Sequence, residues 1–210
     1  MIDTLIVLVG IAGLWSLWGF FSSRVEQTEY TVVKNMNGYE IRECPAHIVA
    51  KTTVQGSYGE AMSDGFRIVA RYIFGGNTKK VSIAMTAPVV AQRGSAVSEN
   101  IAMTAPVVAT RDGDSHTISF SMPRSYTMET LPTPDDSRVK IVMIPTTTYA
   151  VLKFSWYRTD ARIHAMQETL SAALARDGVV TQGSMAYAGY NAPWTPPWMN
   201  RNEVMIQVIQ

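Results

Sequence analysis

The sequence places two amphipathic helices at a fixed interval, and this repeat constrains the fold more than any other feature. The first predicted helix begins at Tyr58 and is closed by Gly76, and the second begins at Asp160 and is closed by Gly178. Each carries an apolar stripe at helical spacing, and a glycine at the end fits a left-handed cap. Because both boundaries are offset by the same 102 positions, we infer an internal duplication.

Short β-type runs surround the helix in each half of the chain. Two strand-helix-strand-strand units would place both helices over one continuous antiparallel sheet that curls toward a distorted barrel. The predicted class is therefore α+β, with duplicated βαββ units. The predicted strands are Tyr39–Arg42, His47–Val54, Ile83–Ala91, Ile101–Ala109, His116–Met122, Val139–Ile144, Thr148–Trp156, Met185–Tyr190 and Glu203–Ile209.

An uncharged apolar segment precedes these elements. Thr4 to Ser23 contains no charged residue, and as a helix its 20 residues would span about 30 Å, the thickness of a bilayer's hydrocarbon core. Tryptophan and phenylalanine crowd its C-terminal end, as is typical of a membrane interface. A cleaved signal peptide is the alternative, but Asp3 replaces the usual basic start. We predict a transmembrane anchor at 1–23, a polar linker at 24–38 and a binding domain at 39–210.

The anchor predicts a single-pass membrane protein. The lysine and arginine residues nearest to it all follow it in the chain, which favours, weakly, a domain on the cytoplasmic side.

Charge and motifs exclude several functions. Lys+Arg 18 against Asp+Glu 17 gives a formal net charge of +1, so no basic field favours nucleic acid as a partner. Hydrolase, metalloprotease, redox and dinucleotide signatures are missing. The single cysteine, Cys44, excludes a cysteine-rich metal site. The sequence thus predicts a binding protein rather than an enzyme, and no metal site is certain.

Several strings in the sequence point to one family. The chain resembles the SOUL haem-binding protein family from about Tyr39 to its C-terminus, and the repeated Ile-Ala-Met-Thr-Ala-Pro-Val string is highly specific. This resemblance implies a duplicated βαββ barrel and non-covalent binding of haem or a related tetrapyrrole in an apolar cleft beside the first helix. The strings are Tyr39–Arg42, Val49–Thr52, Gly65–Phe66, Tyr72–Asn77, Ile83–Val89, Phe120–Pro123 and Tyr190–Trp194.

The resemblance also implies residues for this cleft. The first helix would supply one apolar wall, and the segment from Tyr190 to Arg201 would supply the other. Arginine would pair with the haem propionates, because a guanidinium binds carboxylate in a bidentate way. The expected wall residues are Met62, Phe66, Val69, Tyr190, Trp194 and Trp198, and the expected propionate partners are Arg67, Arg71 and Arg201.

Axial ligation of the iron is open at this stage. Cys44, which precedes Pro45, and His47 are possible axial ligands, since thiolate and imidazole both bind haem iron. His116 is a further strand-edge histidine, and His164 falls on the polar side of its helix.

Two alternatives remain. An apolar helical stripe is also typical of a plain core. The duplicated barrel could instead be a binding module for another small amphipathic ligand or for a protein partner. The favoured hypothesis is tetrapyrrole binding at a membrane surface, for buffering, delivery or sensing.

Overall fold

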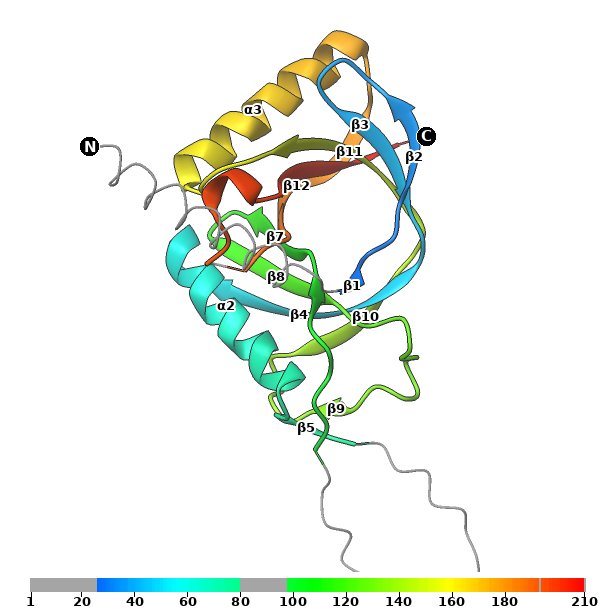
Figure 1. The fold of residues 1–210 in the computed structure, drawn as a ribbon, viewed down its shortest axis with the longest axis vertical. Coiled ribbons are helices and arrows are strands. Elements are labelled where there is room, and N and C mark those ends of the chain that lie inside the picture. Colours follow the sequence, from blue (N-terminus) through cyan, green and yellow to red (C-terminus); the bar gives the residue numbers. More distant parts are fainter. Residues whose placement is uncertain (1–25, 80–97, 193, 210) are drawn as a thin grey trace, which may run out of the picture.

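Nine antiparallel strands form one curled sheet with both helices on its convex side (Figure 1). The structure is a computed structural model and describes residues 26–79, 98–192 and 194–209. The helices are α2 (Tyr58–Ile73) and α3 (Asp160–Asp177). The strands of this sheet are β2 (Thr31–Asn35), β3 (Glu40–Cys44), β4 (His47–Gln55), β7 (Val107–Asp112), β8 (Ser115–Ser121), β10 (Lys140–Ile144), β11 (Thr147–Phe154), β12 (Thr181–Gly189) and β13 (Asn202–Val208).

Short elements complete the fold. Among the described residues they are two two-stranded ladders, of which β1–β6 is parallel and β5–β9 is antiparallel, and one 3-10 turn. Their bounds are β1 (Glu26–Gln27), β5 (Asn77–Thr78), β6 (Thr104–Ala105), β9 (Thr133–Pro134) and η1 (Pro197–Met199).

The order of the strands confirms two repeated units under one sheet. The order is β10-β4-β8-β7-β12-β13-β11-β3-β2, and apart from the edge strand β2 it is symmetric about the β7–β12 pair. The first unit is β4, α2, β7 and β8, and the second is β11, α3, β12 and β13. The flanking strands are exchanged, because β3 precedes β4 in the chain but pairs with β11, whereas β10 precedes β11 but pairs with β4. The two units therefore hold each other in place.

Each helix covers the convex face of its own unit. In the first unit, Val69 and Ile73 of α2 pack in one cluster with Ile118 and Phe120 of β8. The second cluster joins α3 to β11 and β13, with Ile163, Leu170, Leu174, Leu152 and Val204 at its centre. The predicted helical stripes thus face the sheet, as amphipathic helices must.

The sheet is an open half-barrel, which differs from the predicted barrel. Its two outer strands, β10 and β2, do not pair with each other. Every residue of β2 is exposed, and its pairing with β3 is interrupted by a register shift between Val32 and Lys34. A bulged, solvent-exposed strand is a typical way to end a sheet.

The predicted linker at 24–38 also differs from the structure. It contains β1 and β2, and β2 is a paired edge strand of the main sheet. Nearby, the Thr28 amide donates to the carbonyl of Ala105 at 2.9 Å, and the Thr28 hydroxyl donates to Ser121 at 2.7 Å. The polar composition of this segment reflects an exposed edge strand, not a linker.

Two predicted segments cannot be compared with the structure. The anchor at 1–23 and the strand at Ile83–Ala91 lie outside the described residues. Within the part of the chain that is described, neither helix is long and apolar enough to cross a bilayer.

A buried ionic network crosses the concave face of the sheet. The Nη1 of Arg42 on β3 donates to the Glu203 carboxylate on β13 at 2.9 Å, and the two side chains are 1% and 0% exposed. Glu203 also accepts from the Tyr190 hydroxyl at 2.8 Å and from Arg201 Nη2 at 2.8 Å. Burial disfavours the charged form of Arg42, but Glu203 and Glu40 outweigh it and raise its pKa.

Tyr30, which follows β1, contacts both arginines of this network. The Arg42 guanidinium lies 4.2 Å from the centre of the Tyr30 ring, and Arg201 donates to the Tyr30 hydroxyl at 3.2 Å. The Nη2 of Arg42 is buried without an acceptor among the described residues. The network therefore joins β3, β13 and the residues between β1 and β2.

Replacing Glu203 should destabilise the protein strongly. In Glu203→Leu, Arg42 would stay buried with only Glu40 as a partner, and a broken buried pair of this kind costs about 3 kcal/mol. Urea denaturation would measure the change in the free energy of unfolding. The control is Glu168→Gln, which removes an exposed pair with His164 and should cost less than about 0.5 kcal/mol. Equal, small losses in both variants would contradict a structural role for the network.

Candidate functional site

Local sequence signals place α2 tightly against the sheet. Ser57 precedes the helix, and its amide and hydroxyl both donate to the Glu60 carboxylate, at 3.3 and 2.7 Å. A carboxylate in the first turn that accepts from the residue before the helix fixes the helix start. A Cβ on Gly65 would lie 2.6 Å from a side-chain carbon of Ile118 in β8, so only glycine allows this approach. Ser57 and Glu60 therefore define where α2 begins, and Gly65 defines how closely the helix packs on the sheet.

The two flanks of α2 differ in chemistry. Phe66 lies on the flank toward β8, where its ring centre is 5.3 Å from that of Phe120. Phe120 is fully buried, but Phe66 remains 39% exposed. In the sheet order β8 leads to β7 and β12, so this flank faces the second unit of the fold. Met62, one turn earlier, is half-buried, and the flank is thus apolar and partly open.

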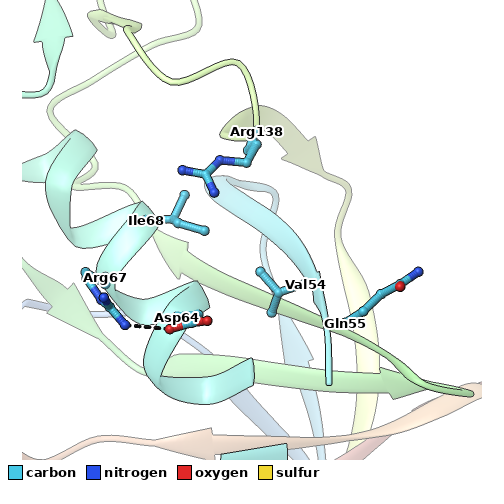
Figure 2. A pocket seen from close by; sticks show the side chains of 6 residues that line it. All are labelled: Val54, Gln55, Asp64, Arg67, Ile68 and Arg138. Atoms are coloured by element: carbon cyan, nitrogen blue, oxygen red, sulfur yellow. Dashed lines mark hydrogen bonds and ion pairs between the residues drawn. The ribbon is translucent and has the colours of Figure 1, made fainter. Parts of the chain in front are cut away.

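The other flank of α2 is polar and borders an open cavity of ≈ 360 Å³ (Figure 2). The guanidinium of Arg67 is paired with Asp64 at 2.5 Å, and Arg138 is paired with Asp136 at 2.6 Å. Hydrogen bonds from Arg138 lower the pKa of Asp136 to about 2. This cavity is lined by Val54, Gln55, Asp64, Arg67, Ile68 and Arg138.

The structure therefore separates the predicted residues of the first helix. Met62 and Phe66 lie on the apolar flank, whereas Arg67 lines the polar cavity on the opposite side. Arg71 is exposed one turn beyond Arg67. Val69 has no exposed surface and packs in the core cluster between α2 and the sheet.

The segment between β12 and β13, residues 190–201, is also divided. Trp194 is 58% and Trp198 is 46% exposed, so both present apolar surface to solvent. Tyr190 is 8% exposed and bonds to Glu203 on the concave face. Arg201 lies 3.9 Å from the centre of the Tyr190 ring and is paired with the same carboxylate. The sheet itself thus separates Tyr190 and Arg201 from the apolar flank of α2.

Comparison with known proteins decides the family. Residues 25–207 match the family described as "SOUL heme-binding protein". The chain belongs to the SOUL haem-binding protein family. Heme-binding protein 2 from Homo sapiens is 31% identical over 169 residues, which cover 78% of this chain and 74% of the human protein. The resemblance inferred from the sequence strings is therefore confirmed.

Solved structures share the fold of this SOUL family member. The EcmrR C-terminal domain aligns with a TM-score of 0.57 at 10% identity, covering 86% of this chain and 98% of that domain. A hydrolase from Listeria innocua aligns with a TM-score of 0.50 at 13% identity, covering 84% and 94%. At these identities the likeness shows the fold alone.

The possible axial ligands of this SOUL chain lie away from α2. Cys44 shares the concave face with Arg42, two residues before it on β3. Burial raises the pKa of the Cys44 thiol to about 11, which disfavours the thiolate that would bind iron. His47 is half-buried at the start of β4, and its Nδ1 lies 2.9 Å from the carbonyl oxygen of Pro45. Neither residue joins the apolar flank of α2.

The other two histidines, His116 and His164, also contact neighbouring side chains. His116 is 2% exposed, and its ring packs edge-on against Tyr58 with centres 5.8 Å apart. His164 is exposed on α3 and pairs with Glu168 at 3.2 Å. Within the described ranges, no three histidine, cysteine or carboxylate side chains group together as metal ligands. The residues present suit the apolar plane of a tetrapyrrole better than its iron.

One exposed aromatic pair near this surface carries no signal in the sequence pattern. Trp156 and Tyr157 are 49% and 62% exposed between β11 and α3. The amide of Trp156 donates to the carbonyl of Pro197 in η1 at 3.0 Å, which places this pair beside Trp198. The sequence pattern placed Trp156 at the end of the predicted strand Thr148–Trp156, whereas β11 ends at Phe154. For this reason the exposed position of Trp156 was not predicted.

The half-buried Cys44 thiol, whose pKa is raised, predicts slow alkylation. At pH 8 the native protein should react with iodoacetamide about 100-fold more slowly than a free cysteine, because a pKa of about 11 leaves little thiolate. The rate should rise about tenfold per pH unit up to that pKa. Mass spectrometry reads the result cleanly, since the chain has one cysteine. Fast alkylation before urea is added would show that Cys44 is accessible.

Proposed function

We propose that this chain binds haem or a related tetrapyrrole non-covalently, without converting it, on the apolar flank of α2. The observation that carries the proposal is Phe66, a ring backed by the buried Phe120 but itself 39% exposed beside the second unit of a SOUL fold. A planar apolar ligand gains most from such a rigidly backed aromatic face. Trp194 and Trp198, on the connection between β12 and β13, would supply the opposite wall.

Arg67 can serve the carboxylate edge of such a ligand. It follows Phe66 in the chain but lines the polar cavity on the other flank of α2, so its 76% exposed side chain would have to swing across the outer face of the helix to reach a ligand on the apolar flank. Its pair with Asp64, which is 59% exposed, contributes little free energy in water. A propionate could therefore replace Asp64 as the partner of this guanidinium.

The iron does not drive this binding. Cys44 and His47 belong to the concave side of the sheet or its edge, so a tetrapyrrole on the convex side would not meet either of them. We infer that contacts to the macrocycle and its carboxylates supply most of the affinity.

We further propose that the protein acts at a membrane surface, in buffering, delivery or sensing. The uncharged segment from Thr4 to Ser23 has the length and composition of an anchor. Tetrapyrroles with propionate groups are amphipathic and partition into bilayers, so an anchored binding domain would meet them there.

Titration of the full-length protein in lipid nanodiscs tests the proposal. Haemin and metal-free protoporphyrin should both bind saturably, with dissociation constants within about threefold of each other, because no axial ligand is required. Absorbance in the Soret region, corrected with empty nanodiscs, measures the binding. A response equal to that of empty nanodiscs would contradict the proposal.

Phe66→Ala should weaken protoporphyrin binding about tenfold, because it removes the exposed ring on which the macrocycle would stack. Phe74→Ala is the matched control. Phe74 follows the end of α2 and is 60% exposed, and its removal should leave the affinity unchanged. Equal affinities in both variants would place the ligand elsewhere.

A further inference from the structure

Trp156 has a backbone conformation that its side chain disfavours. Its φ is 78°, and among the described residues no other residue apart from glycines has a positive φ. A bulky side chain in this region costs free energy, because its Cβ crowds the following carbonyl. Such outliers persist where the surrounding structure holds them, and they gather at functional sites.

Two hydrogen bonds hold Trp156 in this conformation. Its amide donates to the carbonyl of Pro197 at 3.0 Å, and its carbonyl accepts from Asn202 Nδ2 at 3.0 Å. Asn202 is 3% exposed, and its other side-chain atom accepts from the Tyr187 hydroxyl at 2.7 Å. The strained residue is thus bonded to η1, in the segment that carries the predicted ligand wall, and to the first residue of β13.

The result of this arrangement is an outward-facing aromatic pair. The rings of Trp156 and Tyr157 lie 6.4 Å apart and both remain about half exposed or more. A half-exposed tryptophan obtains only part of the hydrophobic stabilisation of a buried one. Burial of the ring therefore does not explain why the backbone of Trp156 is strained.

The position of this pair fits the proposed ligand site. The bond to Pro197 places Trp156 beside η1, which also carries Trp198. In Figure 1, η1 lies between the first turns of α2 and α3 on the convex side of the sheet. Tyr58, the first residue of α2, packs against the core cluster beneath α3, which ties the two helix starts together.

We propose that Trp156 is a ligand-binding residue, whose ring lies beside Trp198 and extends the aromatic wall that meets the tetrapyrrole plane. This inference rests on the proposed function and extends the site to the loop between β11 and α3. The hydrogen bonds from Asn202 and to Pro197 hold the backbone that carries the ring before the ligand arrives, which lowers the entropy lost on binding.

Paired substitutions separate this role from a structural one. Trp156→Ala and Trp156→Gly both remove the ring, so both should weaken protoporphyrin binding by the full-length protein about tenfold. Only glycine accepts φ 78° without strain, so the glycine variant should melt about 3 °C above the alanine variant. Equal affinity losses at unequal stability would assign the loss to the ring.

Four outcomes are distinguishable. If the wild-type protein binds protoporphyrin and both variants bind equally well, the inference fails and the proposed function stands. If only the less stable alanine variant loses affinity, Trp156 has a structural role and the inference fails. If the wild-type protein itself does not bind, both fail. Trp156→Phe, which keeps a ring, should recover most of the affinity and would support a role of the aromatic ring in binding.

Discussion

The buried Glu203 carboxylate is the constraint on which the rest of the structure depends. It accepts hydrogen bonds from Arg42, Tyr190 and Arg201, and it has no exposed surface. A buried ion is tolerated only when its acceptor sites are filled in this way. Because Arg42 lies on an exchanged strand and Glu203 on the second unit, the network fixes how the two units join. It also fills part of the concave face with paired charges.

The sheet therefore has two chemically different sides. Its concave side holds an ionic network and a thiol whose pKa is raised by burial, and its convex side carries helices with partly exposed aromatic rings. A large apolar ligand would gain free energy by covering the exposed rings on the convex side. On the concave side it would have to displace paired charges, which costs free energy. Phe66 lies on the convex side in the first unit, and Trp156 lies there in the second. The hydrogen bond from Trp156 to Pro197 joins Trp156 to the connection between β12 and β13.

Much of the fold could be predicted because it rests on local signals. Helical periodicity and the closing glycine gave the bounds of α3 at Asp160–Asp177, and Gly178 does adopt the left-handed cap. The exchange of β3 and β10 could not be predicted, since pairing across about 100 residues leaves no local pattern. The same applies to the site: Tyr190 and Trp194 are four residues apart, yet only the sheet register shows that Tyr190 faces the buried network.

Hydrogen exchange of the full-length protein with and without protoporphyrin tests the central claim most directly. The account predicts slower exchange in residues 58–73 and 190–201 and in the loop around Trp156, with the concave strands β3 and β13 unchanged. Such protection reports where opening of the backbone is suppressed by a ligand. Protection confined to β3 and β13, with none in α2, would place the ligand on the concave side and contradict the account.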